Sequence, residues 1–277
     1  MFPAFTLAYL GRRSVNSMRP ATTLLSSAIL FMACGQEPAP AKTDSMTTMN
    51  TTTPAAQLLT VEIWSDVVCP FCYIGKREFE NALARFPHRD SVQVIWKSFE
   101  LDPSAPARAE QDTYGMLSEK YGMTREQAME RTRGVRERAA TLGLHYDFDK
   151  AIVGSSFHAH RLIQLAKTKG LGAEAEERLF RAYFTEGAHL ADTTTLVRLG
   201  MEIGLNTAEV EQMLASDLFA DAVRRDEQEA QQIGVRGVPF FLLADKYTVS
   251  GAQSSEHFLG ALEQAWRERM ASPAEQH

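Results

Sequence analysis

The sequence predicts an α/β protein in which a strand–helix–strand unit and a later strand–strand–helix unit flank a large all-helical insertion. Three observations lead to this fold class. Short β-rich segments surround a helical pattern within residues 59–96, only helical patterns follow over residues 109–233, and strand patterns return after residue 237. Hydrophobic residues make up 44% of the chain and charged residues 23%, as in ordinary soluble globular proteins.

The first unit begins near Leu58. Residues 59–65 alternate apolar with polar side chains and predict a strand, as do residues 92–96. Between them, residues 74–86 place large apolar side chains on one helical stripe, and Pro87 ends the helix. A Cys-x-x-Cys motif stands between the first strand and this helix.

The insertion contains a clear helix start and several further helices. Thr124 and Gln127 have the spacing of a capping box, in which each side chain bonds the other residue's backbone N–H. Gly143 is expected to close that helix. Further helices are predicted at 156–169, 173–185, 194–203 and 207–214, and a longer one follows Ser216 as its cap and ends at Gly234.

The last unit consists of predicted strands at 238–243 and 247–249 and a final amphipathic helix capped by Ser255. Residues 35–57 are rich in Pro, Thr, Ala and Ser and predict a flexible tether. The predicted parts are a signal peptide (1–34), the tether (35–57), a first domain part (58–108), the inserted helical domain (109–215), a second domain part (216–271) and a disordered tail (272–277).

The N-terminus predicts export. From Met18, the cationic Arg19 precedes a short apolar run that ends at Ala33. An apolar run of roughly 7–15 residues before a small residue is typical of a secretory signal and is too short to span a bilayer. A twin-arginine signal at Arg12-Arg13 is a poorer match, and the sequence leaves open whether translation starts at Met18 or upstream.

Cys34 is the odd cysteine of three. Phe31-Met32-Ala33-Cys34 resembles a bacterial lipoprotein box, in which the cysteine is acylated after cleavage, although Phe31 stands where Leu is usual. We therefore predict an exported lipoprotein of the cell envelope or periplasm, held at the membrane by a lipid anchor only. The alternative is an ordinary cleaved signal that leaves Cys34 as a free thiol.

Cys69-Pro70-Phe71-Cys72 carries the strongest functional signal. Cys69 falls at the expected helix N-cap and Pro70 at the first helical position, where its missing N–H costs nothing. The free N–H groups of the helix stabilise a thiolate there, so Cys69 is the predicted exposed nucleophile and Cys72 the less exposed resolving thiol. A structural zinc site needs two more ligands, and neither a second cysteine pair nor a suitable histidine pair is present. We expect a redox-active Cys69–Cys72 disulfide, with no metal and no other cofactor.

Two further features refine this hypothesis. Phe71 cannot stabilise a thiolate as a polar residue would, so we expect a less extreme reduction potential than that of the strongest oxidants. Val238-Pro239 opens a predicted central strand, where proline is unusual unless its peptide bond is cis or the backbone stays unpaired. An ordinary strand-opening proline is the alternative.

These segments resemble the FrnE-like branch of the DsbA family in the thioredoxin superfamily. The similarity is carried by SDVVCPFCYIGK (65–76), FRAYF (180–184), GVRGVPFF (234–241) and VSGAQ (249–253), and it covers about residues 60–270. It implies a thioredoxin fold with an inserted all-helical domain and thiol–disulfide oxidoreductase or isomerase activity on proteins. The family commonly has Trp where this chain has Phe71, and most relatives are cytosolic, so the export signal is a departure.

The resemblance also implies a substrate site. In a thioredoxin-type fold the Val238-Pro239 loop lies against the dithiol and aligns an extended substrate, which Phe71 would also contact. The superfamily includes kappa-class glutathione transferases and 2-hydroxychromene-2-carboxylate isomerases, which typically have serine at the first cysteine position. Cys69 and Cys72 argue against that glutathione-dependent function, which remains one alternative; a chaperone-like binding module is another.

Two residues outside these motifs are candidate assistants. Asp66 lies three residues before Cys69 and could assist proton transfer during resolution, or it could simply cap the loop. His160 and Arg161 resemble a His-Arg pair that recurs in the family. His160 could face the cleft, but its place near the polar boundary of the helix favours a surface histidine, and His158 is the expected core histidine.

Charge and composition limit the partners. The net charge of -6 argues against nucleic acid. The expected partners are protein thiol and disulfide substrates and an unidentified redox partner. No dimerisation element is visible, so we expect a monomer. The sequence does not determine whether the protein oxidises, reduces or isomerises disulfides.

Overall fold

The computed structural model of the chain describes residues 8–9 and 58–271. Cys34, the tether at 35–57 and the tail at 272–277 lie outside the described residues, as does nearly all of the expected signal peptide. Within the described part, no helix has the length and apolar character needed to cross a bilayer.

The described elements are, in chain order, β1 (Ala8–Tyr9), β2 (Leu59–Ser65), α1 (Pro70–Arg85), a short 3-10 helix (Arg89–Ser91), β3 (Val92–Ser98), α2 (Thr113–Tyr121), α3 (Arg125–Ala140), α4 (Phe157–Lys167), α5 (Gly172–Phe184), α6 (Thr193–Glu202), α7 (Thr207–Leu214), α8 (Ala220–Gln232), β4 (Phe240–Leu243), β5 (Tyr247–Ser250) and α9 (Ser255–Ala271). From β2 onward the strands and α-helices follow the predicted order, whereas β1 and the short 3-10 helix were not predicted.

One mixed sheet organises these elements, with strand order β1-β5-β4-β2-β3. β2 pairs parallel with β3 and antiparallel with β4. In this register Ile63 is paired with Trp96 of β3 and with Phe241 of β4. The remaining pairs, β4 with β5 and β5 with β1, are antiparallel. The strand β2, which is paired on both sides, ends at Ser65, and Cys69 follows four residues later, so an interior strand of the sheet positions the motif.

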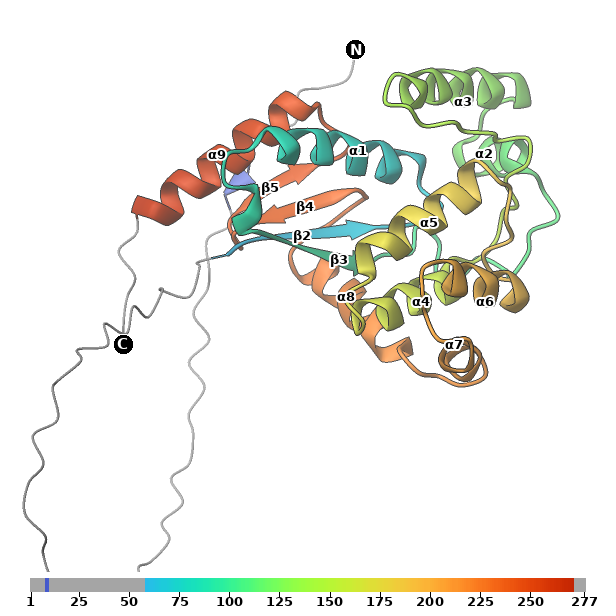
Figure 1. Cartoon of the computed structure of the whole chain (residues 1–277). Helices are drawn as coiled ribbons and strands as arrows, with labels where there is room; N and C mark the ends of the chain where they lie inside the picture. The colour runs from blue at the N-terminus through green and yellow to red at the C-terminus, as the bar shows by residue number, and fades with distance from the viewer. Residues whose placement is uncertain (1–7, 10–57, 272–277) are drawn as a thin grey trace, which may run out of the picture. The chain divides into compact units, whose positions relative to one another are not determined.

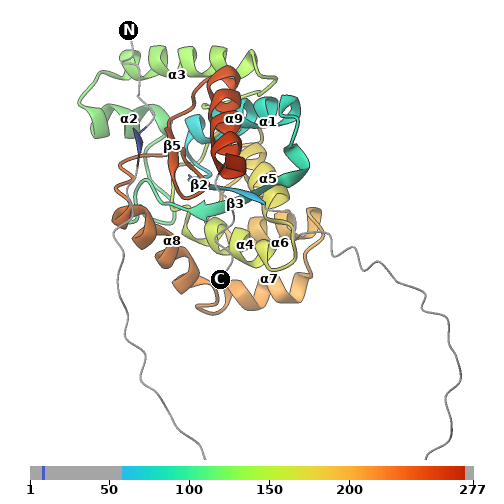
Figure 2. The ribbon, with the colours of Figure 1, turned by 90° about the vertical axis from the view of Figure 1, so that its left-hand side faces the viewer.

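Helices cover both faces of the sheet. Figures 1 and 2 show α1 and α9 on one face and α8 with α4 on the other. Phe79 of α1 and Phe258 of α9 pack with Phe241 of β4 in the first layer. On the opposite face, Trp64 of β2 packs with Ala230 of α8. The structure confirms the predicted α/β thioredoxin fold with a large helical insertion between β3 and α8.

The insertion and the dithiol share one apolar core. Cys69, Cys72 and Tyr73 belong to the same cluster of buried residues as the inner faces of α4 and α5. Every residue of α4 from 159 to 166 is buried, because neighbouring elements surround this helix. The helical insertion therefore forms part of the surroundings of the reactive cysteines.

Of the predicted serine and threonine helix caps, one is confirmed and two are not. The capping box of Thr124 and Gln127 is present with both of its hydrogen bonds. The prediction for Ser216 was wrong: its hydroxyl donates to the carbonyl of Gln212, and α8 begins later, at Ala220. The cap of α9 is offset by one residue, because α9 starts at Ser255 and the hydroxyl of the preceding serine accepts the His257 N–H.

Candidate active site

The dithiol sits at the N-terminus of α1. Cys69 is the N-cap in extended conformation, and Pro70 occupies the first turn. The N–H of Cys69 donates to the carbonyl of Asp66 at 2.9 Å, and the N–H of Cys72 donates to the carbonyl of Cys69 at 3.0 Å. These turns place both cysteines at the N-terminus of α1. Both cysteines are free thiols in this structure.

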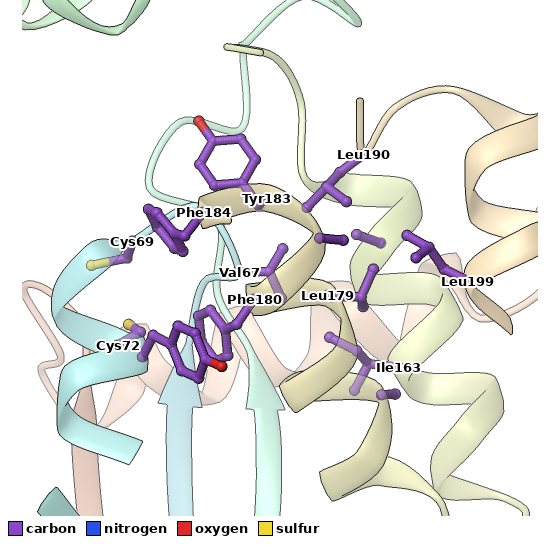
Figure 3. Packing of buried hydrophobic residues seen from close by; sticks show 14 of the residues in the cluster. Val67, Cys69, Cys72, Ile163, Leu179, Phe180, Tyr183, Phe184, Leu190 and Leu199 are labelled. Atoms are coloured by element: carbon purple, nitrogen blue, oxygen red, sulfur yellow. The ribbon is translucent and has the colours of Figure 1, made fainter. Parts of the chain in front are cut away.

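Neither thiol is openly exposed. Cys72 is 1% exposed, as a resolving thiol should be, but Cys69 is only 4% exposed, so the prediction of an exposed Cys69 was wrong for this conformation. Neighbouring elements cover Cys69, and its sulfur contacts the carbonyl of Val238 at 3.6 Å. Figure 3 shows both cysteines at the start of α1, with the Cys69 sulfur pointing away from Phe184 of α5.

The thiol of Cys72 resists ionisation. Burial raises its pKa well above the ordinary value, and the adjacent Cys69 raises it further. The backbone of Asp66 and the hydroxyl of Ser65 act in the opposite direction. Because only a thiolate attacks a disulfide, Cys72 needs a nearby proton acceptor before it can resolve a mixed disulfide.

The loop before β4 lies directly against the dithiol. The Val238–Pro239 peptide bond is cis, which agrees with the sequence argument about this proline. A Cβ on Gly75 would lie 2.8 Å from Cγ of Pro239, so only glycine at this position lets α1 approach the loop so closely. The structure thus brings Val238 and Pro239 to Cys69, while their role in aligning a substrate stays a prediction.

Phe71 points outward between the cysteines. Its side chain is 38% exposed. It therefore offers an apolar contact beside the nearly buried Cys69, as the substrate-binding prediction requires.

Asp66 and His160 meet beneath the dithiol. Asp66 accepts the N–H of Leu101 at 2.7 Å and the N–H of Val68 at 3.3 Å, and its Oδ1 lies 3.4 Å from Nε2 of His160. Both side chains are at most 1% exposed. The expectation of a surface histidine was wrong: His160 is fully buried, whereas His158 is only half-buried.

The reversal of the two histidines has a physical cause. A helical wheel assumes one apolar and one polar face, but α4 is buried on all sides over residues 159–166. His160 therefore lies in the interior. Burial lowers its pKa, but Asp66, Glu176 and Glu100 outweigh burial and raise the pKa above its ordinary value.

Sequence reasoning missed Glu176. This residue of α5 is 1% exposed, and its Oε2 has no hydrogen-bond partner among the described residues. Burial raises the pKa of its carboxyl to about 7, against the opposing charges of His160 and Lys76. Its neighbours Glu174 and Glu177 gave no signal to separate it from an ordinary charged helix face.

The second member of the His-Arg pair has a structural function. The guanidinium of Arg161 donates to the carbonyl of Leu218 at 2.9 Å and also to the carbonyls of Met213 and Ser216. These bonds tie α4 to the segment that follows α7, and they satisfy carbonyls at a helix end.

Aromatic side chains of the insertion pack against the active-site helix α1. Tyr73 stacks on Phe180 with ring centroids 4.8 Å apart, and Tyr146 stacks on Phe184 at 4.5 Å. The hydroxyl of Tyr146 donates to the carbonyl of Pro70 at 2.8 Å. Through this hydrogen bond, a residue of the insertion contacts the backbone between the two cysteines.

A cavity of about 950 Å³ opens on the Asp66 side of the dithiol. Asp66, Val68 and Tyr183 line it, together with residues of segments 101–120 and 153–156. Within residues 58–271, no group of His, Cys, Asp and Glu is arranged to hold a metal ion.

The family comparison agrees with this geometry. The chain matches the DSBA-like thioredoxin domain family over residues 60–263, which include the dithiol, the insertion and the cis-proline loop. The protein belongs to this family. The DSBA-like thioredoxin domain thus spans most of the chain.

Individual relatives support the same assignment. The uncharacterized protein YwbO of Bacillus subtilis is 30% identical over 204 residues, which cover 73% of this chain and 94% of that protein. A probable DsbA oxidoreductase of Streptomyces coelicolor is 45% identical with a TM-score of 0.76, covering 79% of this chain and 94% of the other. The cytosolic disulfide reductase DsbM of Pseudomonas aeruginosa shares the fold, with 19% identity and a TM-score of 0.54 over 76% of this chain and 100% of DsbM. Membership of the DSBA-like family supports oxidoreductase or isomerase activity.

Proposed function

We propose that this DSBA-like protein exchanges disulfides with protein cysteines through Cys69 and Cys72. The observation that carries the proposal is the free thiol pair at the N-terminus of α1, with the Cys69 sulfur 3.6 Å from the carbonyl before the cis-proline. An extended substrate segment would pair with the backbone at Val238 and contact the exposed ring of Phe71.

The exchange proceeds in two steps. The Cys69 thiolate attacks one sulfur of a substrate disulfide; a Cys69–substrate bond forms, and the other substrate sulfur leaves as a thiolate. The Cys72 thiolate then attacks the Cys69 sulfur, closes the Cys69–Cys72 disulfide and releases the second substrate thiolate. Two electrons pass from the protein to the substrate, and the reverse sequence oxidises a substrate dithiol.

An insulin-reduction assay with dithiothreitol tests this proposal. The wild type should accelerate insulin precipitation, Cys69→Ser should not, and Cys34→Ser should match the wild type as a control. Equal precipitation rates for the wild type and Cys69→Ser would refute the proposal. Glutathione conjugation that survives Cys69→Ser would favour the transferase-like alternative, and client binding without either cysteine would favour a binding module.

We also propose that the protein acts in the cell envelope as a monomer anchored through acylated Cys34. The proposal is supported by Arg19, the apolar run that ends at Ala33, and the box-like residues before Cys34. Cell fractionation should find the wild type with the membrane and Cys34→Ala in the soluble envelope fraction. Recovery of the wild type from the cytosol would contradict export.

A further inference from the structure

Three segments meet at the edge of the sheet where the dithiol lies. β2 ends at Ser65 and leads to Cys69, and the parallel strand β3 ends beside it, with the N–H of Phe99 donating to the carbonyl of Ser65 at 3.1 Å. On the other side of β2, the antiparallel strand β4 begins at Phe240, directly after the cis-proline loop. The order across this edge is therefore the cis-proline loop, the dithiol and the segment that follows β3.

The cavity of about 950 Å³ lies on the β3 side of this edge. Residues between 101 and 120 contribute to its lining, and so does Val68, the residue directly before Cys69. Neighbouring strands of a sheet are about 4.8 Å apart, and an extended residue spans about 3.3 Å. A substrate segment that pairs with Val238 and crosses Cys69 therefore continues toward the cavity. A side chain within about three residues of the substrate cysteine can reach it.

The cavity contains buried polar groups with hydrogen-bonding capacity to spare. Tyr183 is 6% exposed and Ser156 is 4% exposed; both line the cavity, and neither hydroxyl has a hydrogen-bond partner within residues 58–271. Figure 3 shows the Tyr183 hydroxyl pointing away from α5. The carboxylate of Asp66, which also lines the cavity, accepts two backbone N–H groups and lies beside His160. Because a carboxylate has about four acceptor sites, Asp66 can accept a further hydrogen bond.

This lining fits a long side chain that ends in a positive charge. Leu101, Met116 and Val153 are among its apolar residues and can pack against the methylene stem of a lysine or an arginine. An ammonium or guanidinium group has donors only, which match the acceptor oxygens of the buried groups. An anionic side chain would instead face the carboxylate of Asp66. Carboxylates also outnumber cations in the lining, with Asp66, Asp102, Glu110 and Glu119 against Arg108 and Lys120.

We propose that this cavity binds a lysine or arginine side chain that lies close to the reacting cysteine of a protein substrate. The inference rests on the disulfide-exchange function proposed above and adds a class of substrate to it. The bound side chain holds the substrate segment across the dithiol while Cys69 attacks. Tyr183 and Ser156 are then specificity-determining residues, which contact the substrate away from the reacting sulfurs.

Matched peptide disulfides test this proposal. Each substrate consists of two copies of a short peptide joined through their single cysteine, and it reacts with reduced full-length protein carrying Cys34→Ser. Attack by Cys69 releases one peptide thiolate, and closure of the Cys69–Cys72 disulfide releases the other. Acid quenching and chromatography then give the second-order rate constant. Separate peptides carry lysine, arginine, norleucine or glutamate at each position within about three residues of the cysteine.

The comparison with norleucine isolates the charged head group, because norleucine has a similar unbranched stem without it. At the best position, lysine and arginine should react about tenfold faster than norleucine, as a hydrogen bond to a charged group implies, and glutamate should react most slowly. A peptide with the same lysine at its far end controls for attraction to the net charge of -6 and should react much like the norleucine peptide.

Variants of the cavity make the result specific. Tyr183→Phe removes only a hydroxyl and should lower the ratio of the lysine rate to the norleucine rate about threefold, and Ser156→Ala should act similarly. Tyr121→Phe makes the same change at a tyrosine that is 59% exposed and outside the cavity, and it should keep the wild-type ratio. Thermal melting of each variant verifies folding.

Two kinds of failure are distinguishable. Equal rates for the near and far lysine peptides, or a wild-type ratio in both folded cavity variants, would overturn the inference while peptide thiol release still supports disulfide exchange. Release of no peptide thiol from any of the peptides would refute the disulfide-exchange function, and the inference with it.

Discussion

Replacing Glu176 with glutamine should change how stability depends on pH. The residue is 1% exposed, and burial raises the pKa of its carboxyl from 4.5 to about 7. The folded protein therefore binds more protons than the unfolded chain between these values, so this group's contribution to stability is complete below pH 4.5 and is lost as pH rises through 7. At about 1.4 kcal/mol per pKa unit, ionising Glu176 in the fold costs about 3 kcal/mol.

Urea unfolding of reduced protein measures this effect, with buried Trp64 contributing to the fluorescence signal. Glutamine stays neutral at every pH, so the stability of Glu176→Gln relative to the wild type should rise by about 3 kcal/mol between pH 4.5 and pH 8. Glu174→Gln, at an exposed position on the same helix, should show no such change. A stability difference between Glu176→Gln and the wild type that is equal at both pH values would refute the reasoning.

Three further predictions concern the surroundings of the dithiol. Gly75→Ala places a Cβ 2.8 Å from Cγ of Pro239. We therefore expect the free energy of unfolding in urea to fall by about 1–3 kcal/mol and insulin reduction to be slower. Unchanged values would show that the cis-proline loop can move away without cost. The reduction potential in a glutathione buffer should fall within roughly −270 to −120 mV, and Phe71→His should raise it by stabilising the thiolate, whereas an equal or lower value would contradict that account of Phe71. Arg161→Lys should cost about 3 kcal/mol, because lysine cannot serve all the carbonyls that the guanidinium satisfies, and a change below about 1 kcal/mol would show that those bonds are replaceable.

Local and periodic signals were enough to predict the architecture. The alternation at residues 59–65, the N-terminal Pro70 and the capping box at Thr124 each act over a few residues, so neighbouring sequence alone determines them. The order of strand and helix patterns then gave the α/β class and the position of the insertion. The Cys69-x-x-Cys72 spacing predicted a redox pair for the same reason, since its geometry is set within one helical turn.

Only the tertiary structure decided how accessible and how charged the site is. Cys69 proved nearly buried because its surroundings include Val238, which lies 169 residues away in the sequence. His160 and Glu176 became interior groups because α4 and α5 pack beneath the dithiol, and a helical pattern does not reveal burial on every side. Burial and neighbouring charge, which set the pKa values of these groups, depend on contacts between distant segments. The sequence alone therefore identified the reactive pair, whereas the fold determined the groups that surround it.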